Sequence, residues 1–64
     1  MAAKELLDRA ERLRREARFG DAINFYRAAA VAPDATEEII KRSLASIELM
    51  QEINGFVNVD LMNP

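Results

Sequence analysis

Residues 6–33 read LLDRAERLRREARFGDAINFYRAAAVAP, and this stretch decides the fold. Apolar residues recur at helical spacing in both of its halves. The positions are Leu6, Ala10, Leu13, Ala22, Tyr26 and Ala29. Residues three or four apart share one face of a helix, and Phe19-Gly20-Asp21 between the halves is typical of a turn. Because large and small side chains alternate, the pattern predicts a hairpin of two closely packed helices.

The first predicted helix runs from Ala2 or Ala3 to Ala17 and is apolar on one face and charged on the other. The apolar positions are Ala3, Leu6, Leu7, Ala10, Leu13 and Ala17. On the charged face, acids precede bases by four residues, an order in which each pair adds about 0.2–0.5 kcal/mol. The pairs are Glu5 with Arg9, Asp8 with Arg12, and Glu11 with Arg15.

The second predicted helix begins at Asp21 or Ala22 and ends at Ala32. Gly20 suits the left-handed backbone that ends many helices, and Asp21 is a good N-cap residue. Its apolar positions are Ala22, Ile23, Phe25, Tyr26, Ala29 and Ala30. Pro33 follows, and the residue before a proline is biased away from helical geometry.

The third predicted helix spans Ala35 to Ile53 or Asn54. Asp34, followed three residues later by Glu37, resembles a capping box, and Asn54-Gly55 favours a helix end. The main apolar stripe is Ile40, Leu44, Ile47, Met50 and Ile53.

The hairpin resembles a tetratricopeptide repeat in its small and aromatic positions, Ala10, Ala22, Tyr26 and Ala29. That family repeats about every 34 residues, and a shift of that size places Leu6 on Ile40, Ala10 on Leu44 and Leu13 on Ile47. The chain departs from the family where Leu6 replaces the usual Trp and Ala17 the frequent turn glycine. The resemblance implies an all-α fold of three helices, one repeat hairpin plus a capping helix, over residues 1–55. The short apolar tail at 56–64 is expected to pack on the helices or on a partner, because its side chains would otherwise form an exposed apolar patch.

Tetratricopeptide proteins hold peptides on the surface lined by the first helix of each repeat, so the resemblance implies a protein-binding role. The corresponding positions are Lys4, Leu7, Glu11, Arg14 and Arg15 with Glu38, Lys41, Ala45, Glu48 and Leu49. The family's carboxylate clamp is not expected, because Leu7 and Glu11 occupy its positions in the first helix. An ordinary solvated surface is the alternative for this face.

Self-association through the third helix and the tail is a second expectation, since stacked repeats normally bury each other's apolar faces. The candidate residues are Met50, Phe56, Val57, Val59, Leu61 and Met62. A self-associating structural module without a separate ligand is therefore an alternative function. Microtubule-interacting-and-transport domains are a further alternative, because the segment from Ala22 to Tyr26 is similar to their Ala-Ile-x-x-Tyr pattern.

Composition argues against several other classes. The chain has 64 residues, no cysteine and no histidine, so neither a disulfide nor a zinc site of the usual ligands is expected. Most acids have a base one helical turn away, which favours solvated ion pairs over a catalytic site, and no enzyme activity, cofactor or metal is expected.

Charge is unevenly distributed, although the net charge is only −2. Residues 1–18 carry six cations and four anions, whereas residues 34–64 carry two cations and six anions. The low net charge gives no drive toward nucleic acid or an anionic membrane. No apolar run would span a bilayer and no signal peptide is visible, so cytoplasmic location is the default expectation.

Overall fold

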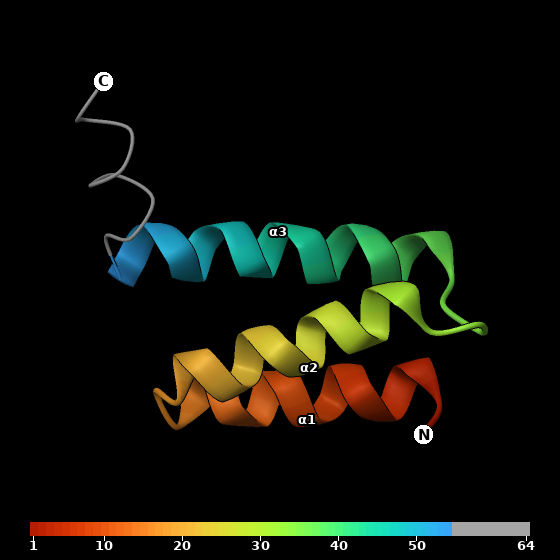
Figure 1. Cartoon of the computed structure of the whole chain (residues 1–64), viewed down its shortest axis with the longest axis horizontal. Helices are drawn as coiled ribbons and strands as arrows, with labels where there is room; N and C mark the ends of the chain where they lie inside the picture. The colour runs from red at the N-terminus through yellow and green to blue at the C-terminus, as the bar shows by residue number, and fades with distance from the viewer. Residues whose placement is uncertain (55–64) are drawn as a thin grey trace.

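Three α helices make up residues 1–54, the part of the chain that the computed structural model describes (Figure 1). They are α1 (Ala3–Arg15), α2 (Phe19–Val31) and α3 (Glu37–Asn54). Helix α2 runs antiparallel to both neighbours, so α1 and α3 point the same way. The expected all-α, three-helix fold is confirmed for these residues.

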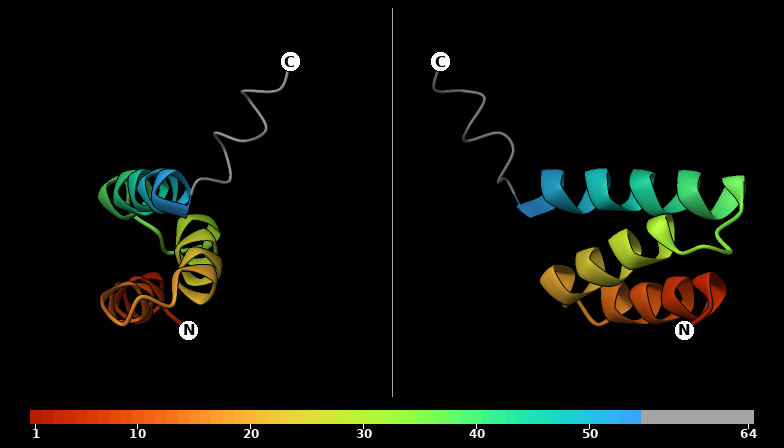
Figure 2. Two further views of the ribbon diagram at one scale, coloured as in Figure 1. Left: turned by 90° about the vertical axis from the view of Figure 1, so that its left-hand side faces the viewer. Right: turned by 45° about the vertical axis from the view of Figure 1, so that its right-hand side comes forward.

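Helix α2 is the central element of the fold. It packs against α1 along one side and against α3 along another, whereas α1 and α3 contact each other only slightly. Viewed end-on, α1 and α3 lie on the same side of α2 (Figure 2, left). The described helices therefore form a curved layer and not a closed bundle.

A single apolar cluster joins the three helices. Its buried members are Leu7, Ala10, Ala22, Ile23, Tyr26, Ala29, Ile47 and Met50. Tyr26 is fully buried, and so are the alanines Ala10, Ala22 and Ala29. Small side chains let the helix backbones approach each other closely. Burial of one large apolar side chain stabilises a fold by roughly 1.5–3 kcal/mol. Tyr26 fills the space that the alanines leave, as the alternation of large and small residues predicted.

The buried face of α3 differs from the predicted stripe. Ile47 and Met50 are buried as expected, but Leu44 is 55% exposed and Ser43 is fully buried. Successive helical residues differ by about 100° around the axis, so a face centred on Ser43 turns Leu44 outward. The predicted stripe included Leu44 and left out Ser43 because it was chosen by hydrophobicity alone. The repeat alignment, which matches Ala10 with Leu44, therefore pairs a buried residue with an exposed one. The side chain of Ile53 lies outside the described part.

The turn between α1 and α2 lies earlier than predicted. Helix α1 ends at Arg15, and Ala17 takes the left-handed conformation with φ of 64°. Gly20 and Asp21 are inside the first turn of α2, so Asp21 is not its N-cap. Its carboxylate instead accepts a 2.7 Å hydrogen bond from the Arg18 guanidinium.

The connection between α2 and α3 also differs from the prediction. Helix α2 ends at Val31, and α3 begins at Glu37. The Thr36 hydroxyl caps α3 by accepting a 3.2 Å bond from the backbone N–H of Ile39. Asp34, the expected cap of α3, instead accepts hydrogen bonds from the backbone of Ala3 in α1. Within residues 1–54, none of the helices has the length and apolarity needed to cross a bilayer.

Replacing Ala17 with glycine should stabilise the chain. A left-handed backbone costs a residue with a Cβ about 1–2 kcal/mol, a cost that glycine avoids. Glycine also loses more backbone entropy on folding, which offsets part of this stabilisation. We expect Ala17→Gly to raise the free energy of unfolding by up to about 1 kcal/mol, measured by urea denaturation. Ala28→Gly, within α2, is the matched control and should lower stability by a similar amount. A destabilised Ala17→Gly variant would show that the turn is not left-handed.

Candidate functional site

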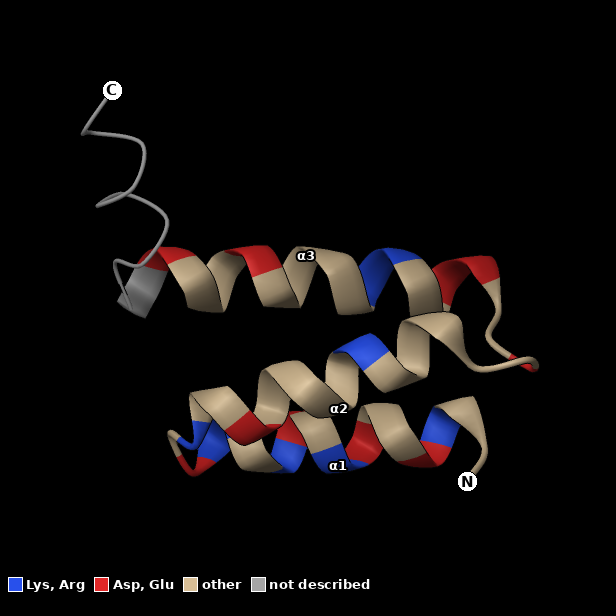
Figure 3. Cartoon of the chain, in the orientation of Figure 1, with Lys and Arg blue, Asp and Glu red and all other residues tan. Residues whose placement is uncertain are grey.

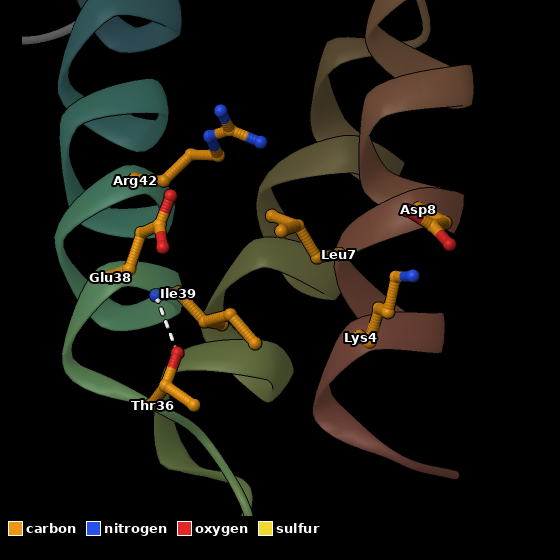
Figure 4. Close-up of a pocket in the computed structure, with 7 residues that line it drawn as sticks. All are labelled: Lys4, Leu7, Asp8, Thr36, Glu38, Ile39 and Arg42. Carbon is orange, nitrogen blue, oxygen red and sulfur yellow. Dashed lines mark hydrogen bonds between the residues drawn. The ribbon is translucent and has the colours of Figure 1, made fainter.

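A hollow of about 250 Å³ lies between the first turns of α1 and of α3 (Figure 4). We call it the α1/α3 groove. Its lining residues are Lys4, Leu7 and Asp8 from α1, with Thr36, Glu38, Ile39 and Arg42 from the start of α3. The groove exists because both helices pack on the same side of α2 but contact each other only slightly.

The centre of the groove is apolar. Leu7 and Ile39 extend from the two opposite helices into the space over α2 (Figure 4). Leu7 is only 6% exposed and belongs to the core, and Ile39 packs against that core. The apolar surface of the groove is therefore held in place by the folding core itself.

Charged side chains of both signs frame this apolar centre. Lys4 and Asp8 stand one helical turn apart on α1, and Glu38 and Arg42 have the same spacing on α3. Residues four apart lie on one helix face, so each wall carries one cation and one anion. All four residues are exposed. The groove is thus close to neutral overall while offering a partner for either charge on each side.

An ion pair joins the two walls of the groove. Arg42 Nη1 lies 3.7 Å from Glu11 Oε2, one turn beyond Asp8 on α1. The Arg42 side chain is about half exposed, so the pair is screened and contributes less than about 1 kcal/mol. It still fixes the direction of the long Arg42 side chain, which reaches from α3 toward α1 (Figure 4).

Asp34 holds the N-terminal end of α1 in place. Its two carboxylate oxygens accept hydrogen bonds of 3.1 and 3.2 Å from the backbone N–H of Ala3. The first N–H groups of a helix have no partner within the helix and favour a negative charge. The N-cap residue Ala2 makes no side-chain cap hydrogen bond. Asp34, in the connection before α3, therefore adds a cap to α1 and ties its first turn to the start of α3.

The predicted binding residues are divided among several environments. Lys4 and Leu7 line the groove, as does Glu38, and Glu11 forms the ion pair across it. Arg14 is half-buried, and within residues 1–54 its Nε is buried without a hydrogen-bond partner.

The remaining predicted positions do not line this groove. Arg15, Lys41, Ala45, Glu48 and Leu49 are exposed. The prediction missed Asp8, Thr36, Ile39 and Arg42. Two of these carry a recognisable signal, because Asp8 and Arg42 each stand four residues after another predicted groove residue.

The predicted self-association residues are mostly outside the described part. Met50 is the exception, and it is fully buried in the core, so its side chain is not offered at the surface. Phe56, Val57, Val59, Leu61 and Met62 lie outside the described residues.

The size and chemistry of the groove suit side chains better than a whole small molecule. Pockets for drug-sized ligands usually measure about 300–1,000 Å³, and this one is smaller. Within residues 1–54, no three Asp or Glu residues cluster closely enough to hold a metal ion. Comparison with models of protein families, with curated proteins and with solved structures finds no match.

Removing the Asp34 carboxylate should destabilise the fold at this end of the groove. Loss of a helix cap costs about 0.5–2 kcal/mol, so we expect Asp34→Ala to lower the free energy of unfolding by about 1 kcal/mol in urea denaturation. Asp34→Asn is the matched control, because it keeps an oxygen acceptor and should lose clearly less. Equal stability of Asp34→Ala and the parent chain would contradict the capping role.

Proposed function

We propose that this chain is a protein-interaction module that binds a short peptide segment in the α1/α3 groove. The observation that carries the proposal is the apolar centre formed by Leu7 and Ile39 between walls that each bear both charges. An apolar side chain of the peptide enters this centre, and flanking charges on the peptide pair with the walls. Burial of the apolar side chain supplies affinity, and the charges supply orientation.

The arrangement of the helices supports the same proposal. In the tetratricopeptide family, which the hairpin resembles, peptides lie along the surface formed by the first helix of each repeat. Helices α1 and α3 occupy these places in the resemblance, and the groove lies between them.

The exposure of the groove's charged residues favours binding over catalysis. Asp8 and Glu38 are both solvent-exposed. A carboxylate that acts as a general acid or base usually needs burial or a close like charge to tune its proton affinity. We therefore assign recognition to this surface and no chemical step.

Peptides selected from a random library displayed on phage provide the test. The selection uses the whole chain as bait, and affinities are then measured by isothermal titration calorimetry. Asp8→Trp places a large side chain at the groove wall and should weaken selected peptides about tenfold or more, a loss of roughly 1.4 kcal/mol. Asn24→Trp, on the exposed face of α2, is the matched control and should leave affinity unchanged.

Changes in amide chemical shifts on peptide addition show independently where the peptide binds. We expect the largest amide shift changes at Leu7 and Ile39 in two-dimensional NMR spectra. The proposal fails if no peptide is selected, if Asp8→Trp binds as well as the parent chain while remaining helical, or if the shift changes gather on α2.

A further inference from the structure

The outward face of α3 exposes an apolar side chain next to an acidic residue. Leu44 is 55% exposed, and Ile40, one turn earlier, is only partly buried. Glu48 stands one turn after Leu44 and forms no ion pair within residues 1–54. Residues four apart share a helix face. Ile40, Leu44 and Glu48 therefore form one continuous stripe, which we call the α3 outer face.

A second hollow, of about 130 Å³, lies between α1 and α2. Its lining residues are Arg9, Arg12, Leu13 and Phe25. Leu13 and Phe25 are partly buried and pack against the core, whereas both arginines are exposed. The hollow is about half the size of the α1/α3 groove. It combines an apolar base with a basic rim, and we call it the α1/α2 hollow.

These two surfaces are complementary in charge. Helix α1 carries five basic and three acidic residues, whereas α3 carries two basic and four acidic ones. Figure 3 shows the basic residues of α1 along its length and acidic residues toward both ends of α3. Neither Arg9 nor Arg12 forms an ion pair within residues 1–54, so both guanidinium groups are free to meet an acidic partner.

The two surfaces of one copy cannot reach each other. The α1/α2 hollow is lined by residues of α1 and α2 alone, whereas the α3 outer face is exposed to solvent at Leu44. Because the surfaces are complementary yet separated, the partner that fits both is a second copy of this chain. Two α3 helices packed on each other would instead bring together two helices of net negative charge, which like-charge repulsion disfavours.

We propose that copies of this chain associate head to tail, with the α3 outer face of one copy on the α1/α2 hollow of the next. Leu44 enters the hollow against Leu13 and Phe25, and Glu48 pairs with the arginines at its rim. Such a contact uses different surfaces on the two copies, so it adds copies until a ring closes or a filament grows. The α1/α3 groove is not part of this contact.

Two variants that each block one surface test the proposal. Leu44→Lys removes the apolar side chain and cancels the negative charge of the α3 outer face but leaves the α1/α2 hollow intact. The double variant Arg9→Glu/Arg12→Glu reverses the charge at the rim of the α1/α2 hollow and leaves the α3 outer face intact. In sedimentation velocity the parent chain should exceed its monomer mass of 7.2 kDa in a concentration-dependent way, whereas each variant alone should remain monomeric.

Mixing the two variants distinguishes a head-to-tail contact from every symmetric one. Each variant retains the surface that the other lacks, so the mixture should form a one-to-one complex that grows no further. Added salt should weaken this complex, because its charges are exposed. Val31→Lys replaces another exposed apolar residue, and Arg27→Glu reverses another exposed base. Both controls should associate as the parent chain does.

Three results would overturn the proposal. The first is a parent chain that stays monomeric at every concentration. The second is a Leu44→Lys variant that associates like the parent chain. The third is a mixture of the two variants that forms no complex although circular dichroism shows both to be helical.

Discussion

The close approach of α2 to both other helices is the constraint on which the rest of the structure depends. Ala10, Ala22 and Ala29 are fully buried, and their small side chains allow this approach. Tyr26, also fully buried, fills the remaining space. In a close-packed interior even one added methylene group can lower the stability of the fold. Larger residues at these positions would push α1 away from α2 and change the width of the α1/α3 groove, so core packing and the groove are physically linked.

The helices themselves could be predicted from the sequence because their signals are local. The recurrence of Ala22, Tyr26 and Ala29 at helical spacing identified the buried face of α2 correctly. The rotation of α3 could not be predicted, because it depends on burying Ser43, whose hydroxyl has no hydrogen-bond partner within residues 1–54. The first turn was also misplaced, since Gly20 carries the usual local signal and Ala17 adopts the left-handed backbone without it.

For the candidate site too, residues that depend on local pattern could be predicted, whereas those that depend on tertiary packing could not. Lys4 and Leu7 could be predicted because they lie on the face of α1 that the repeat pattern already defined. Ile39 could not, because the wall that α3 contributes depends on its rotation about its own axis. The cap that Asp34 gives to α1 joins residues 31 positions apart, and no local sequence pattern contains that contact.

Amide hydrogen exchange of the native chain tests most directly whether α2 supports both other helices. An element that packs on two neighbours opens only when both contacts are lost, so its amides exchange with the free energy of global unfolding. We expect residues 22–29 to exchange most slowly in the chain, with α1 and α3 opening at lower free energies. Faster exchange in α2 than in α1 or α3 would contradict a fold organised around α2.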